Sequence, residues 1–104
     1  MSIEKIRLAA SKRILYLPHA VAQMSRIDRM ISTDDIERVI FYGEIIEDYP
    51  EDKRSPSCLL LGKDLTDNPV HVVCSAQNEF LAIITAYRPS LTEWDGKFRE
   101  RKTK

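Results

Sequence analysis

Four apolar runs in the second half of the chain, separated by short polar loops, most constrain the fold. The runs are Glu44–Tyr49, Ser57–Leu61, Val70–Ala76 and Phe80–Tyr87. The longest loop between two of them, residues 62–69, has only eight residues. Parallel neighbours need a crossover of about a dozen residues or more, so strands joined by such short loops must run antiparallel. The pattern therefore predicts a four-stranded antiparallel meander.

A short strand and two helices are predicted ahead of the meander. A β-favouring run at residues 13–17 ends at a proline, and proline suits the first position of a helix over residues 19–29. A second helix begins at Ser32, and Asp35 three residues later resembles the partner in a capping box. We expect Gly43 to end this helix in the left-handed conformation.

These elements together predict an α+β fold with the order β-α-α-β-β-β-β. Two helices pack on one face of a four- to five-stranded antiparallel sheet, which gives two layers. A length of 104 residues predicts a single domain, spanning residues 1–104. Residues 1–12 fit an N-terminal arm or a short helix, and residues 95–104 form a basic tail.

The charge of the chain is balanced overall but unevenly distributed. Lys and Arg number 16, Asp and Glu number 16, and the net charge of zero argues against a general nucleic-acid binder. Residues 31–52 carry eight acidic side chains and one basic, whereas both flanking regions are basic. This distribution fits either opposite acidic and basic faces or ordinary solvated surfaces.

The lack of long apolar segments predicts a cytoplasmic protein. The N-terminus has no apolar stretch of signal-peptide quality, and no run approaches the roughly 20 apolar residues of a membrane helix. Cys58 and Cys74 lie inside strands and are expected to be reduced core thiols, with a disulfide as the alternative. Neither has a CxxC partner, so we expect no metal site, and the sequence indicates no cofactor.

Two histidines are the first candidates for chemistry. His19 opens a helix, where the positive helix end favours the neutral ring that a general base needs. It fits a capping or packing role equally well. By strand alternation, His71 points away from Val70 and Val72 and onto an open face of the sheet. There it can meet a ligand or bond to neighbouring strands.

Metal-free RNA cleavage needs a base, an acid and a cation that holds the phosphate. Depending on register, Tyr87 or Arg88 joins His71 on the exposed face, and Arg54 with Lys53 lies in a loop that can reach over it. The catalytic candidates are His19, His71 and Tyr87. The phosphate-binding candidates are Arg26, Arg29, Arg54 and Arg88. For each arginine, a surface ion pair with the acidic block is the alternative.

The chain resembles a bacterial family known as domain of unknown function 4258, from about Leu15 to Trp94. The residues that carry the resemblance are Pro18-His19-Ala20, Met24, Arg29, Ile31-Ser32, Asp35-Ile36, Gly43-Glu44-Ile45-Ile46, Tyr49-Pro50, Pro69-Val70-His71-Val72-Val73, Ile84-Thr85-Ala86-Tyr87, Pro89 and Trp94. The family is in turn similar to the RelE and ParE toxins, whose β-α-α-β-β-β arrangement agrees with the predicted order.

The resemblance implies the toxin component of a toxin–antitoxin system, a metal-independent mRNA endoribonuclease. It also implies an antitoxin partner with a zinc-finger domain, an mRNA or ribosome target and a possible homodimer, with no membrane partner. His19, His71 and Tyr87 stand at positions that match the pattern of the family. The alternative is a non-catalytic protein-interaction module of the same fold, which would use the open sheet face or the acidic helix.

Overall fold

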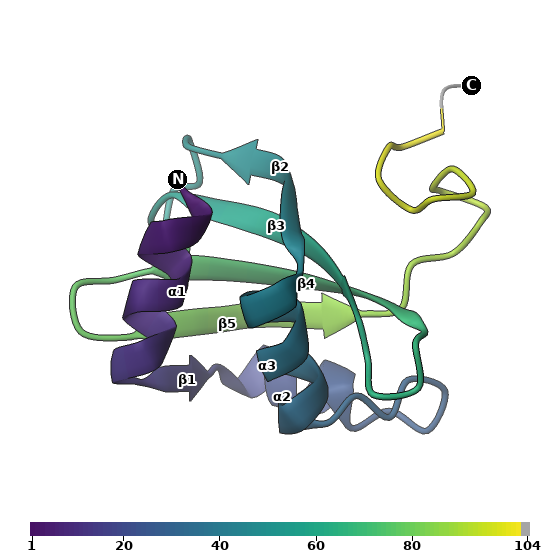
Figure 1. Cartoon of the computed structure of the whole chain (residues 1–104), viewed down its shortest axis with the longest axis horizontal. Coiled ribbons are helices and arrows are strands. Elements are labelled where there is room, and N and C mark those ends of the chain that lie inside the picture. The colour runs from purple at the N-terminus through teal and green to yellow at the C-terminus, as the bar shows by residue number, and fades with distance from the viewer. Residues whose placement is uncertain (103–104) are drawn as a thin grey trace.

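The computed structural model describes residues 1–102, which form three helices around one side of a five-stranded sheet (Figure 1). The helices are α1 (Ile3–Lys12), α2 (Pro18–Met24) and α3 (Thr33–Tyr42). The strands are β1 (Ile14–Tyr16), β2 (Glu44–Tyr49), β3 (Ser57–Lys63), β4 (Pro69–Ala76) and β5 (Leu81–Tyr87). The α+β class is confirmed. None of the described helices is long and apolar enough to cross a membrane.

The sheet has the strand order β1-β5-β4-β3-β2 and is mixed. The meander from β2 to β5 is antiparallel as predicted. β1, however, pairs parallel with β5, with Ile14 opposite Leu81. The prediction of a wholly antiparallel sheet was therefore wrong at this edge. Loop length constrains only the direction of strands that follow one another directly. Because two helices and three strands lie between β1 and β5 in the chain, loop length could not predict the direction of this pair.

The N-terminal segment is a helix, one of the two forms that its sequence left open. The Ser2 hydroxyl accepts a hydrogen bond from the backbone N–H of Lys5, which satisfies one of the free donors at the start of α1. Ile6, Ala9 and Ala10 are buried against the rest of the helical layer. The structure thus has one helix more than the two that were predicted.

Helix α3 begins as predicted and ends differently. Ser32 Oγ accepts from the backbone N–H of Asp35 at 3.0 Å, and Asp35 Oδ2 accepts from that of Ser32 at 2.9 Å, which confirms the capping box. Gly43 has φ −87° and ψ −167°, so the predicted left-handed ending was wrong. The chain continues extended into β2, and glycine is needed because a Cβ would overlap the carbonyl oxygens of Val39 and Leu61.

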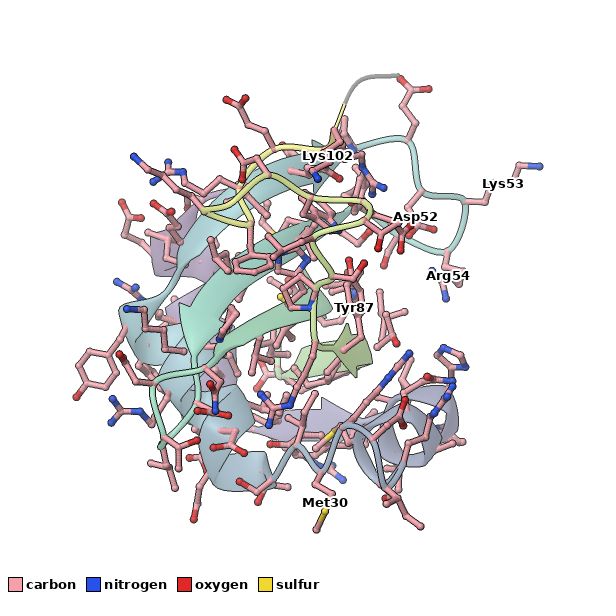
Figure 2. The ribbon with its side chains drawn as sticks, turned by 90° about the vertical axis from the view of Figure 1, so that its right-hand side faces the viewer. Met30, Asp52, Lys53, Arg54, Tyr87 and Lys102 are labelled. Atoms are coloured by element: carbon pink, nitrogen blue, oxygen red, sulfur yellow. The ribbon has the colours of Figure 1, made fainter. Side chains whose placement is uncertain are left out.

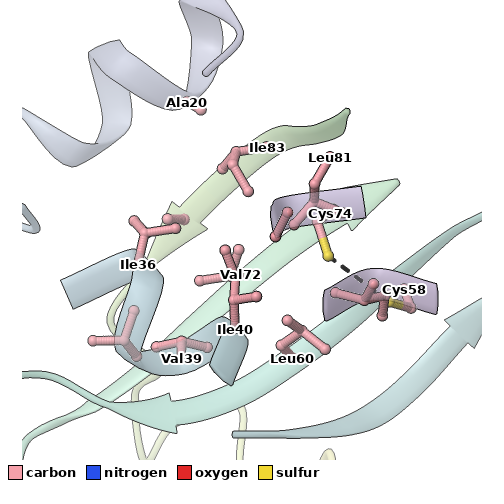
Figure 3. Close-up of a cluster of buried hydrophobic side chains, with 14 of the residues drawn as sticks. Ala20, Ile36, Val39, Ile40, Cys58, Leu60, Val72, Cys74, Leu81 and Ile83 are labelled. Atoms are coloured by element: carbon pink, nitrogen blue, oxygen red, sulfur yellow. Dashed lines mark hydrogen bonds between the residues drawn. The ribbon is translucent and has the colours of Figure 1, made fainter. Parts of the chain in front are cut away.

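The main core lies between the helices and one face of the sheet (Figure 3). The fully buried side chains at its centre are Ile36, Val39, Ile40, Leu60, Val72, Leu81 and Ile83. Cys58 and Cys74 face each other across β3 and β4 in this core, as free thiols with their Sγ atoms 3.9 Å apart. Val70 and Val72 face this core, so His71 between them faces the other side, as the alternation predicted.

The second face of the sheet is covered, which corrects the prediction that His71 points onto an open face. The chain after β5 folds back across this face, which Figure 2 shows from the side where the tail emerges. Trp94 in this segment is only 2% exposed and His71 is fully buried. We call residues 89–102 the C-terminal cover. Residues 103–104 of the predicted basic tail lie outside the described residues.

Candidate functional site

His71 and Tyr87 are direct neighbours on adjacent strands. The register places His71 of β4 opposite Tyr87 of β5. His71 Nδ1 lies 3.2 Å from the Tyr87 hydroxyl oxygen, and the two ring centroids are 5.2 Å apart. The sequence left open whether Tyr87 or Arg88 would share a face with His71, and the structure places Tyr87 there. This pair is the centre of the candidate site.

The other ring nitrogen of His71 contacts the C-terminal cover. His71 Nε2 lies 2.9 Å from the carbonyl oxygen of Phe98, which can only accept a hydrogen bond. In the neutral ring, Nε2 therefore carries the proton, and Nδ1 accepts from the Tyr87 hydroxyl. The cover thus fixes the tautomer that makes Nδ1 the basic atom.

Trp94 completes the packing around the imidazole. Its ring meets that of His71 edge-on, with centroids 4.5 Å apart and planes at 88°. The guanidinium of Arg101 lies over the Trp94 ring, 4.7 Å from its centroid, as a cation–π contact. Trp94 and Arg101 also form an isolated antiparallel bridge, so the cover doubles back on itself here.

Glu47 binds the cover to β2, the strand at one edge of the sheet. Arg101 donates to both carboxylate oxygens of Glu47, with Nε at 3.0 Å and Nη2 at 3.1 Å. The hydroxyl of Tyr49 also donates to this carboxylate. Burial alone would raise the pKa of Glu47, but these hydrogen bonds outweigh it and lower that pKa. A second ion pair, between Arg99 and Glu44 at 2.9 Å, holds the same segment.

Burial keeps both members of the central pair uncharged. It is the main cause of the lowered pKa of His71, and the nearby Arg101 acts in the same direction. Burial likewise raises the pKa of Tyr87 above its usual value near 10. At neutral pH the site therefore holds a neutral imidazole that accepts a hydrogen bond from a protonated phenol. In this arrangement, the proton of the Tyr87 hydroxyl can pass to Nδ1 of His71.

His19 does not join this pair. It is exposed on α2, whose Ala20 and Met24 enter the core on the helical face of the sheet. His71 faces the opposite side. Within residues 1–102 the structure shows no hydrogen bond or ion pair from His19 to any side chain. The sequence proposed the two histidines for one site, and the structure assigns them to different layers.

Two of the predicted phosphate-binding residues are exposed and pair locally. Arg26 forms an ion pair with Asp28 at 3.2 Å, two residues along the chain. Arg54 pairs with Asp52 at 3.2 Å in the β2–β3 loop, and its side chain is 66% exposed. Figure 2 shows Lys53 and Arg54 at the outer end of this loop. Such surface pairs are weak, so these side chains can turn toward another anion.

Arg29 and Arg88 are more firmly held. Arg29 donates to the side-chain oxygen of Gln23 on α2. Arg88 donates from Nε to the carbonyl oxygen of Arg29 at 2.9 Å, and its Nη1 lies 2.8 Å from Asp64 Oδ2 in an ion pair that is not aligned as a hydrogen bond. Asp64 is 3% exposed, so Arg88 joins the α2–α3 loop to the β3–β4 loop. We assign Arg88 to this structural role.

The sequence analysis missed the residues of the C-terminal cover and their partners on β2. These are Glu47, Tyr49, Trp94, Phe98 and Arg101. One signal was present: the single tryptophan of the chain stands in an otherwise polar and basic tail, just before Asp95-Gly96. A large aromatic side chain in such a segment indicates that the segment is docked. Within the described chain, no group of three His, Cys, Asp or Glu residues is placed to hold a metal ion.

Comparison with known proteins yields one match. The model of the family described as "Domain of unknown function (DUF4258)" matches residues 16–88, more than half of the chain. His71 and Tyr87 lie inside the matched region, whereas α1 and the C-terminal cover lie outside it. Neither the curated proteins nor the solved structures gave a match. The chain therefore belongs to the DUF4258 family, whose function is unknown.

Proposed function

We propose that this protein is the toxin component of a toxin–antitoxin system and cleaves mRNA without a metal ion, on a RelE-like fold. The observation that carries the proposal is the hydrogen-bonded pair of His71 and Tyr87 on one face of the sheet. Both residues lie within the region that defines the family. An mRNA target would place its action in the cytoplasm.

In the proposed reaction, the pair acts as the base. Tyr87 is half-buried and His71 is buried, so Tyr87 is the member nearer to solvent. Its hydroxyl oxygen takes the proton of the ribose 2′-OH while its own proton passes to His71 Nδ1. The 2′-oxygen then attacks the phosphorus and the bond to the 5′-oxygen breaks. The resulting imidazolium keeps its Nε2 hydrogen bond to Phe98 and is stabilised by the nearby charge of Glu47.

The phosphate and the leaving group need further partners. Arg54 is the proposed cation, because its side chain is 66% exposed and within residues 1–102 its ion pair is with Asp52, in the same loop. His19 was the other candidate from the sequence, but the base and the acid must reach the same phosphodiester, and His19 on α2 lies in another layer from His71 and Tyr87. The leaving 5′-oxygen therefore takes its proton from water in the proposed reaction.

Expression with matched variants tests the proposal. Wild type, Tyr87→Phe, His71→Ala and the control Tyr16→Phe are induced in bacteria, and growth and mRNA integrity are measured. Tyr87→Phe removes only the hydroxyl, so the fold is retained even if His71→Ala fails to fold. The proposal expects growth arrest and mRNA fragmentation with wild type and Tyr16→Phe, and their loss with Tyr87→Phe. Intact mRNA with wild type, or equal cleavage by Tyr87→Phe, would contradict it.

A specific observation favours the second function, a protein-interaction module. Three large apolar side chains are strongly exposed on the α2–α3 and β3–β4 loops: Ile27 (92%), Met30 (72%) and Leu65 (61%). Arg88 holds these loops together through Asp64 and the carbonyl of Arg29. Figure 2 shows Met30 directed away from the molecule, and its φ of 46° lies in the left-handed region. Apolar patches of this kind mark protein-binding surfaces.

Under the toxin hypothesis, the same patch is the surface that we propose for the antitoxin with its zinc-finger domain. Co-purification with the protein encoded beside this one tests it. Met30→Glu should abolish the complex, whereas Leu8→Glu, which charges a 61% exposed position on α1, should preserve it. Equal complex formation by Met30→Glu and wild type would exclude the patch as the binding surface.

A further inference from the structure

An open groove lies near the candidate site, at the edge of the sheet between helix α3 and the C-terminal cover. It has a volume of about 810 Å³ and lies between the end of α3, the adjoining ends of β2, β3 and β4, and the C-terminal cover. Its lining includes Arg38, Tyr42, Leu61, Lys63, Lys97 and Phe98. Neither the sequence nor the family description assigns this groove a role.

The groove is lined by two residues that contact or face His71, although His71 itself does not line it. Phe98 lines it, and the carbonyl oxygen of Phe98 accepts the hydrogen bond from His71 Nε2. Leu61 lines it as well, and Leu61 is the residue of β3 directly opposite His71 in the register. A ligand in the groove would therefore contact Phe98 and Leu61, the residues through which the groove neighbours His71.

One wall of the groove presents an aromatic ring to solvent. Tyr42, at the end of α3, is 81% exposed, and the guanidinium of Arg38 lies 5.7 Å from its ring centroid. Phe98 provides a second aromatic side chain from the cover, with a φ of 60° that is unusual for a non-glycine residue. Exposed aromatic rings beside arginine are the groups on which unpaired bases stack.

The charges of the groove favour an anion. Its two carboxylates each have a basic partner, since Glu44 pairs with Arg99 and Asp67 with Lys63. The side chains of Arg38 and Lys97 have no ion-pair partner within residues 1–102. Two cations beside neutralised carboxylates suit a phosphate backbone, whose charges account for much of nucleic-acid affinity.

We propose that this groove binds single-stranded RNA and leads it to His71 and Tyr87. The inference rests on the proposed function and adds the route of its substrate. Unpaired bases stack on Tyr42 and Phe98, and phosphates contact Arg38 and Lys97. Duplex RNA is excluded as the preferred ligand, because its bases are stacked on one another and are not available to the two rings.

Fluorescence anisotropy with a labelled, unstructured RNA oligonucleotide tests the groove at low salt. Tyr42→Ala should weaken binding at least about fivefold, the equivalent of one stacked base, whereas Tyr42→Phe should bind like wild type. Arg38→Ala and Lys97→Ala should each weaken binding and make it less dependent on salt. Lys5→Ala removes the same charge from α1, away from the groove, and should change little.

The outcomes separate this inference from the proposed function. Equal binding by wild type, Tyr42→Ala and the Arg38→Ala/Lys97→Ala double variant would overturn the groove, and so would equal affinity for a duplex of the same sequence. Groove-dependent binding without cleavage would support the inference and count against the nuclease. RNA cleavage that these substitutions leave unchanged would support the nuclease and overturn the groove.

Discussion

Trp94 meets the imidazole of His71 edge-on, with ring centroids 4.5 Å apart, although the two residues belong to different parts of the chain. His71 lies inside the region that matches the family, and Trp94 lies beyond its end. The histidine is therefore enclosed by a segment outside the matched region, although the resemblance drawn from the sequence extended to Trp94. The environment of this side chain depends on the C-terminal cover, and substitutions in the cover test that dependence.

Trp94→Ala should release the cover and expose His71. The free energy of unfolding should fall by about 3–5 kcal/mol, the usual cost of removing a buried tryptophan side chain. Urea unfolding measures this change, and diethyl pyrocarbonate modification in a His19→Ala background, which removes the exposed second histidine, reports access to the ring of His71. Leu91→Ala changes a 56% exposed position in the same segment and should leave both unchanged. An unreactive His71 in a folded Trp94→Ala protein would contradict the assignment of the cover.

Stability should decrease below about pH 6.5 because of His71. Burial lowers the pKa of this side chain in the folded state, whereas the unfolded chain has the ordinary value near 6.5. As pH falls, the unfolded state takes up the proton first, so stability is lost from about pH 6.5 down to the lowered pKa of the folded state. Urea unfolding between pH 5 and 8 measures the slope. His71→Asn should flatten it, and a slope equal to that of wild type would exclude His71 as its source.

Arg88→Ala should be destabilising through Asp64. We expect a loss of about 2 kcal/mol, less than for a fully buried pair, because the arginine side chain is 30% exposed and Asp64 keeps hydrogen bonds from Thr66 and Asn68. Thermal and urea unfolding measure the effect. Arg26→Ala breaks a surface pair with Asp28 and should cost under about 1 kcal/mol. Equal losses of unfolding free energy in the two variants would show that the Arg88–Asp64 pair contributes no more than a surface ion pair.

We expect Asp64 to cause a second loss of stability, at more acid pH. Burial raises its pKa, but hydrogen bonds from Asn68 and Thr66, together with Arg88, outweigh burial and lower the pKa to about 2. The unfolded value is near 3.9, so the stabilisation is present above about pH 4 and is lost as pH falls toward 2. Asp64→Asn should reduce the acid sensitivity in this range. Unchanged acid unfolding of that variant would contradict the assignment.

Gly62→Ala should separate β3 from α3. A Cβ at this position would lie 2.8 Å from the Cα of Val39 and 3.1 Å from its Cβ, so the helix would have to move. Overpacking of this kind costs about 1–3 kcal/mol. Gly96→Ala is the matched control, because a Cβ there meets no atom within 4 Å. Melting temperatures of the two variants compare them directly, and equal values would rule out close packing at Gly62.

The sequence was sufficient where local rules determine the structure. Short loops predicted the antiparallel meander. Alternation in β4 predicted that His71 and its neighbours Val70 and Val72 lie on opposite faces of the sheet. The spacing of Ser32 and Asp35 predicted the start of α3. Each of these inferences uses residues that lie close together along the chain. Over such short separations along the chain, backbone geometry alone determines how the residues are placed.

The rest depends on contacts between distant residues, which no local pattern encodes. Arg101 and Glu47 are 54 positions apart, and their ion pair fixes the cover across the sheet. The contact of Phe98 with His71 likewise spans 27 positions. The assignment of His19 to another layer follows from the packing of α2 as a whole. The candidate site was thus only half predictable: its central pair was named, and its enclosure was not.

The parallel pairing of β1 with β5 has a consequence for synthesis of the chain. Ile14 pairs with Leu81, so β1 cannot pair until β5 has been synthesised and has left the ribosome. Until then, β4 presents an unpaired edge and the first 80 residues cannot complete their sheet. Long-range pairing of this kind slows folding and exposes strand edges to other chains. A nascent chain of this protein therefore depends on its last strand for protection against aggregation.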